Sequence, residues 1–107
     1  MAVQVKARMS DSKRVRSGMF VAFVRSQTFR PRPDLCLLFV AVDITEARIM
    51  AAWLVPSEDF DKMAGKPSAR GRLRFYASMK AASRDRWRAY RLEPAELAPQ
   101  VLARLDS

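Results

Sequence analysis

An uninterrupted run of eight apolar residues, 35–42, constrains the fold of this chain more than any other stretch. Asp34 and Asp43 bracket the run, and Pro31 and Pro33 precede it, so any earlier helix must end before it. The run is too short to span a bilayer, and its apolar residues do not alternate with polar ones. These features are typical of a strand that is covered on both faces in the middle of a sheet.

Length and composition predict a single domain over residues 1–107 with one modest core. The only cysteine, Cys36, lies inside the apolar run, so an intrachain disulfide is excluded and a small buried hydrophobe is expected. Because the chain has no histidine, zinc sites of the usual Cys/His type are also excluded. Residues 1–10 lack the apolar stretch that is typical of a signal peptide, and no apolar segment is long enough to span a membrane. We therefore expect a soluble cytoplasmic protein without a membrane partner.

Four further strands follow from local patterns. Residues 3–8 alternate strictly, which places Gln4, Lys6 and Arg8 on one polar, cationic face of a half-buried strand. The other three predicted strands are apolar segments rich in β-forming residues: 19–24, 49–55 and 73–79.

Two helices complete the expected fold. Ser57 is the predicted N-cap of a short helix that stops at Gly65. Pro99 suits the first position of a final helix that reaches Leu105, because a helix starting at Pro94 would carry a proline in its interior. The fold class is therefore α+β: a mixed or antiparallel sheet of about five strands, a short helix after strand four and a C-terminal helix.

The net charge of +9 is concentrated in two basic blocks, residues 1–32 and 66–91, which flank an acidic middle. Fifteen of the twenty basic residues are arginine. Since guanidinium groups bind phosphate in a bidentate way, this distribution indicates a polyanionic partner. A solvated, arginine-rich surface without a partner accounts for the composition equally well.

Gln4 and Lys6 form the pair of residues with the most specific chemistry. Metal-dependent nucleases place a ligand oxygen beside an ammonium group at this spacing, where the oxygen helps to hold Mg²⁺ and the lysine stabilises the transition state. The Gln4-Val5-Lys6 segment resembles the second half-motif of the PD-(D/E)xK restriction-endonuclease-like superfamily, in a Gln-x-Lys variant. Residues 29–35, 53–57 and 73–75 also resemble a group of uncharacterised bacterial proteins of this nuclease-like kind.

The resemblance implies that Gln4 and Lys6 are the catalytic pair, and that an active member would be a Mg²⁺-dependent endonuclease hydrolysing phosphodiesters. The superfamily's first aspartate lies on a strand upstream of the lysine motif, and only five residues precede Lys6. Gln4 is also a poorer Mg²⁺ ligand than a carboxylate. We therefore expect a truncated or catalytically degenerate member, inactive as the chain stands, with Mg²⁺ as cofactor only if the missing acidic ligands are supplied.

The predicted partner is nucleic acid, with DNA favoured over RNA, bound through its phosphate backbone. The expected contacts are cationic side chains: Lys6, Arg8, Arg30, Arg32, Arg86 and Arg88. Trp87 and Tyr90 stand among arginines and suggest ring stacking on a single strand, but core packing of these two rings is the stronger interpretation.

A protein-interaction or assembly module is the alternative function. A first strand without an upstream neighbour is a free sheet edge, which invites pairing with a second copy or with a partner strand. The alternative therefore predicts a homodimer joined through residues 3–8.

Overall fold

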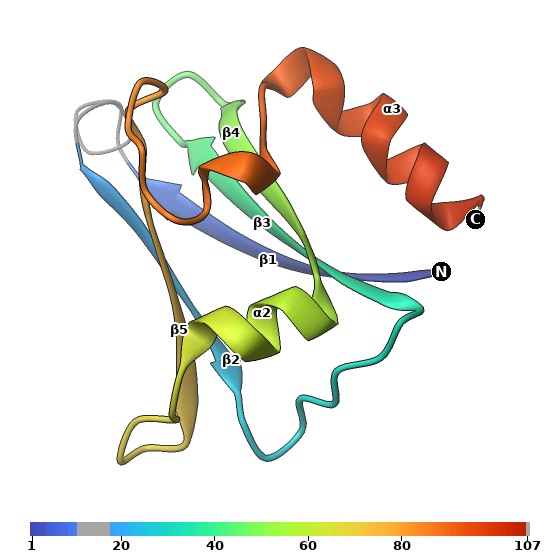
Figure 1. Ribbon diagram of the computed structural model, residues 1–107. Helices are drawn as coiled ribbons and strands as arrows, with labels where there is room; N and C mark the ends of the chain where they lie inside the picture. Colours follow the sequence, from blue (N-terminus) through green and yellow to red (C-terminus); the bar gives the residue numbers. More distant parts are fainter. Residues whose placement is uncertain (11–17, 107) are drawn as a thin grey trace.

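The predicted central strand lies in the middle of the larger of two sheets (Figure 1). The computed structural model describes residues 1–10 and 18–106. In it, β3 (Leu35–Asp43) pairs in parallel with β1 (Ala2–Ser10) and antiparallel with β4 (Arg48–Pro56). The parallel β1–β3 pair makes this a mixed sheet, as expected.

Two strands form a separate sheet. These are β2 (Met19–Arg25) and β5 (Arg72–Ser78), which pair antiparallel. The short β6 (Arg91–Leu92) was not predicted; it follows the 3-10 helix η1 (Arg88–Tyr90) and adds to β4 at the far edge of the larger sheet. The α+β class is confirmed, but the described strands number six and are divided between two sheets. Each predicted strand extends to within a residue or two of its observed bounds.

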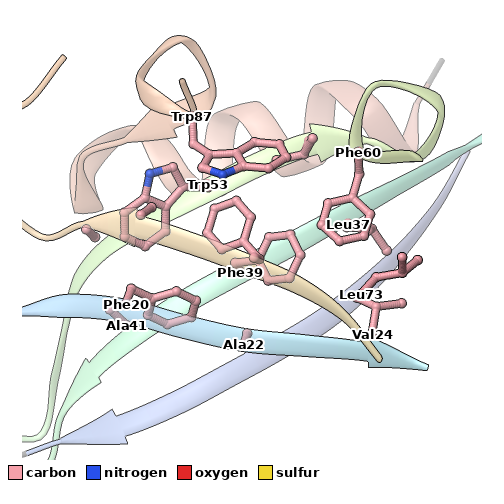
Figure 2. Close-up of a cluster of buried hydrophobic side chains, with 14 of the residues drawn as sticks. Phe20, Ala22, Val24, Leu37, Phe39, Ala41, Trp53, Phe60, Leu73 and Trp87 are labelled. Carbon is pink, nitrogen blue, oxygen red and sulfur yellow. The ribbon is translucent and has the colours of Figure 1, made fainter. Parts of the chain in front are cut away.

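The main core lies between the two sheets (Figure 2). Alternate residues of β3, among them Leu37 and Phe39, face β2 and β5, where Phe20 and Phe75 pack against them. The remaining β3 residues, such as Leu38, face a second cluster on the other side of the sheet. The apolar run is therefore covered on both faces, as its lack of alternation predicted.

Helix α2 (Ser57–Ala64) ends at Gly65, as predicted, but Ser57 is not its N-cap. Pro56 occupies that position, and no side chain caps the helix. The buried Ser57 hydroxyl instead accepts a hydrogen bond from the Arg32 backbone N–H and donates one to the Arg32 carbonyl, both at 2.8 Å. Because water can satisfy the N–H groups of a first helical turn, the hydroxyl is available to bind this distant segment.

Helix α3 spans Pro94–Leu105, so the predicted start at Pro99 is wrong. Pro94 stands in the first turn, where the missing N–H costs nothing, and Glu93 and Glu96 form a reciprocal capping box. These signals define the start, and Pro99 is accommodated in the exposed interior of the helix.

Helix α3 contacts the sheet through only part of its apolar surface. Leu97 and Val101 pack against the second cluster, on the side of the sheet away from β2 and β5. Leu102 and Leu105 remain exposed. Among the described residues, no helix combines the length and apolar content that crossing a membrane requires.

Candidate nucleic-acid interface

The polar face of β1 looks toward the sheet formed by β2 and β5. In the parallel register, Gln4 lies opposite Leu37 and Lys6 lies opposite Phe39. Paired residues of neighbouring strands point to the same side of a sheet. Gln4 and Lys6 therefore leave β1 on the face that carries the main core, and β1 is the edge strand of this sheet.

Lys6 lines a hollow of about 430 Å³ between β1 and the β2–β5 sheet. Its charged lining consists of Lys6 and Arg8 from β1, Arg25 from β2 and Arg72 from β5. Phe23 contributes an aromatic ring to the same lining. We call this site the basic hollow. No carboxylate occurs among the lining residues that the structure describes, so four positive charges share one concave surface.

Arg25 and Arg72 belong to this site, although the sequence alone gave no reason to select them. They lie directly opposite each other in the antiparallel register of β2 and β5. Like charges in this position repel each other and destabilise the strand pair. A bound anion would remove that cost, so the pairing favours an anion-binding role. The sequence shows only that Arg25 is the last and Arg72 the first residue of its strand, each at a position where the alternating pattern points the side chain outward.

A second hollow, of about 520 Å³, lies beside the first at the N-terminal end of β1. It is lined by Gln4, Thr28, Arg30 and Arg32, among others, and we call it the N-terminal hollow. Gln4 and Lys6 thus share a face of β1 but line neighbouring hollows. Sequence reasoning paired them in one site, whereas the structure gives each a different set of arginines.

The segment that carries Arg30 and Arg32 is anchored from inside the protein. Phe29 is buried, and its ring meets that of Phe60 edge-on at 5.6 Å. Ser57 holds the Arg32 backbone by the two hydrogen bonds given above. The Arg32 guanidinium is 3.3 Å from a carboxylate oxygen of Asp34, and both side chains are largely exposed. An exposed pair of this kind contributes little stability and leaves the guanidinium free to exchange partners.

Arg86 and Arg88 lie away from both hollows. They flank Trp87 just before β6, which is at the opposite edge of the larger sheet from β1. Trp87 is fully buried against Phe60, with the Arg86 guanidinium 5.5 Å from its ring. The indole is therefore closed to stacking with a base, and the interpretation of Trp87 as a core residue is confirmed.

The described residues do not offer a donor set that suits Mg²⁺. Gln4 supplies an amide oxygen, but neither hollow has a carboxylate in its described lining. No cluster of three or more acidic, cysteine or histidine side chains with metal-binding geometry occurs in residues 1–10 and 18–106. Mg²⁺ requires oxygen ligands that include carboxylates or substrate phosphates.

The outer edge of β1 is unpaired within the described part of the chain. β1 pairs only with β3, and two of its apolar residues are prominent on the surface: Val5 is 56% exposed and Met9 is 70% exposed. Exposed strand edges with apolar side chains are surfaces on which another strand can add.

A scan against protein-family models found no match, and searches of curated proteins and of solved structures found no significant match.

Proposed function

We propose that this protein is a nuclease-like domain that binds the phosphate backbone of DNA at the basic hollow without cleaving it. The observation that carries the proposal is the convergence of four cations from three strands: Lys6, Arg8, Arg25 and Arg72. Within the described residues, none of the four forms an ion pair with a carboxylate. Their charge is therefore available to an external polyanion.

The neighbouring N-terminal hollow extends this surface along β1. Arg30 and Arg32 line this hollow together with Gln4 and add two guanidinium groups. A duplex presents phosphates at regular intervals, so two adjacent cationic hollows suit successive phosphates of one strand. Guanidinium forks add bidentate geometry to this contact.

We do not expect cleavage, because the described lining of both hollows lacks carboxylates. In a nuclease, Gln4 and Lys6 would need acidic partners to hold Mg²⁺ before the ammonium group could act on the transition state. We infer that Mg²⁺ contributes only where another segment or chain supplies those ligands. We also propose a cytoplasmic location, which agrees with the buried thiol of Cys36 that forms no disulfide.

Fluorescence anisotropy with a labelled 20-base-pair duplex tests the proposed surface. Replacing Lys6 or Arg8 by glutamine is expected to weaken binding and to lower the slope of log K against log salt by about 0.9 for each phosphate that is no longer neutralised. Lys80→Gln is the matched control, because this exposed lysine follows the opposite end of β5 from Arg72. Unchanged affinity and salt slope in both hollow variants would show that the surface is wrong.

A second assay tests whether the protein cleaves DNA. Supercoiled plasmid incubated with the protein and Mg²⁺ is expected to show little or no nicking above the background without protein. Nicking that disappears in the Lys6→Gln variant would overturn the non-catalytic assignment and would restore the active-nuclease interpretation.

An assembly module is the second candidate, because the unpaired edge of β1 exposes Val5 and Met9. Pairing between two copies of β1 would cover both residues. Light scattering at micromolar concentrations should then give a dimer mass, and Val5→Lys should restore the monomer, since an edge charge opposes strand addition. A strict monomer for the unmodified chain rules this candidate out.

A further inference from the structure

The outer face of the β2–β5 sheet carries aromatic rings and arginines in alternation. Residues such as Phe20, Ala22 and Leu73 point into the core (Figure 2). Their neighbours in each strand must point outward, because successive side chains alternate between the two faces. The large or charged outward residues are Met19, Phe23, Arg25, Arg72, Arg74 and Tyr76, and we call this surface the ribbon face.

Two aromatic rings on the ribbon face are open to solvent. Phe23 is 40% exposed and Tyr76 is 43% exposed. The Arg72 guanidinium lies 5.5 Å from the Phe23 ring centroid, and that of Arg74 lies 4.9 Å from the Tyr76 centroid. Each ring therefore lies beside a positive charge and keeps a substantial part of its surface open to solvent.

Among the described residues, no carboxylate compensates the charge of the ribbon face. No acidic residue occurs in the described parts of β1, β2 or β5, and none of Arg25, Arg72 and Arg74 pairs with a carboxylate of the described residues. An apolar protein partner would have to desolvate these guanidinium groups without pairing them, at a cost. A ligand with negative charges and flat rings complements both features.

We propose that the ribbon face binds single-stranded nucleic acid, with bases stacked on Phe23 and Tyr76 and phosphates held by Arg25, Arg72 and Arg74. Single strands offer free base faces, whereas the bases of a duplex are stacked on one another. Phe23, Arg25 and Arg72 also line the basic hollow, so one strand can continue from the ribbon face to Lys6. This inference rests on the proposed function in that both need a nucleic-acid partner, and it specifies the form of that partner.

The test compares labelled dT20 with a 20-base-pair duplex in the same anisotropy assay. Tighter binding of dT20 is expected for the unmodified protein. Phe23→Leu and Tyr76→Leu should each weaken dT20 binding about tenfold, within the range typical of removing one base–ring stack. Tyr76→Leu should change duplex binding less than about twofold, because Tyr76 lies outside the described lining of the basic hollow. Tyr76→Phe should retain the affinity for dT20, because its ring is kept.

Met19→Ala is the matched control for a general apolar contact, because Met19 is exposed on the same face and has no ring. It should leave dT20 binding unchanged. Circular dichroism checks that each variant folds. If Met19→Ala weakens dT20 binding as much as the ring variants do, stacking is refuted. If the protein instead dimerises through this face and the ring variants abolish the dimer, a second copy is the occupant and the inference is also refuted.

The two proposals fail separately. Weakened duplex binding in Lys6→Gln, combined with normal dT20 binding in Phe23→Leu and Tyr76→Leu, would overturn the ribbon-face inference alone. Weakened dT20 binding in the ring variants, with no effect of Lys6→Gln or Arg8→Gln on either ligand, would overturn the basic hollow and support the ribbon face. Absence of binding to both ligands at low salt would overturn both.

Discussion

Phe39 of β3 and Phe75 of β5 stack face to face, with their ring centroids 3.9 Å apart and their planes inclined by 6°. Both rings are fully buried, and the contact joins the two sheets at the centre of the core. The same two strands lead to the basic hollow. Lys6 of β1 lies opposite Phe39, and Arg72 is the first residue of β5, which carries Phe75. The spacing between the sheets therefore sets the width of the hollow.

Phe75→Ala is expected to lower the free energy of unfolding by about 3–5 kcal/mol, because it removes a buried ring and leaves a cavity. Phe23→Ala is the control: the same substitution on the outer face of β2, at a ring that is 40% exposed, should cost about 1 kcal/mol or less. Urea unfolding followed by circular dichroism measures both values. Equal costs would contradict the assignment of these rings to opposite faces of the β2–β5 sheet.

Ser57→Ala should cost about 1–3 kcal/mol of stability, because it leaves the Arg32 backbone N–H and carbonyl without their buried partner. It should also weaken duplex binding, since the segment that carries Arg30 and Arg32 loses an anchor. Ser68→Ala provides the comparison, because the Ser68 hydroxyl makes an exposed 3.3 Å contact with the Arg72 N–H. A loss of stability no larger than that of Ser68→Ala would argue against the anchoring role.

The features that the sequence could predict are those encoded in local sequence patterns. The polar face of β1, the doubly covered β3 and the stop of α2 at Gly65 all depend on residues close together in the chain. The opposition of Arg25 and Arg72 depends on the register between strands that are far apart in sequence, which no local pattern specifies. The ribbon face was missed for the same reason, since its rings come from two strands.

Cys36 should resist thiol reagents in the native protein. Burial raises the pKa of its thiol above the usual value, and the side chain is almost fully enclosed. The reactive thiolate is therefore scarce at neutral pH and sterically shielded. Labelling with a chromogenic disulfide reagent should be slow in buffer and rapid in concentrated urea. Fast labelling in buffer would show that β3 is not the covered strand described above.

Tyr90 should make the stability of the fold decrease at alkaline pH. Burial, together with the 2.9 Å hydrogen bond that its hydroxyl donates to Asp59, raises the pKa of Tyr90 in the folded state. The resulting stability is fully present below the unfolded pKa of about 10 and is lost as the pH rises through the folded pKa. Tyr90→Phe should flatten this part of the stability–pH curve, and Tyr76→Phe, which keeps the Tyr90–Asp59 bond, should not. Parallel curves for the unmodified chain and Tyr90→Phe would contradict the coupling.

Pro99→Ala should stabilise the protein, by up to about 3 kcal/mol, and raise its helical signal. Pro99 lies inside α3, where proline cannot donate the backbone hydrogen bond that an interior helical residue makes, and its exposed ring contributes no core packing that alanine would lose. Pro94→Ala is the control from the same helix, since proline at the first turn loses no hydrogen bond and its fixed φ favours the helix start. Thermal unfolding should therefore give a higher Tm for Pro99→Ala and an unchanged or lower Tm for Pro94→Ala. The reverse order would place the start of the helix at Pro99, and Leu97 would then no longer be held by α3 against the sheet.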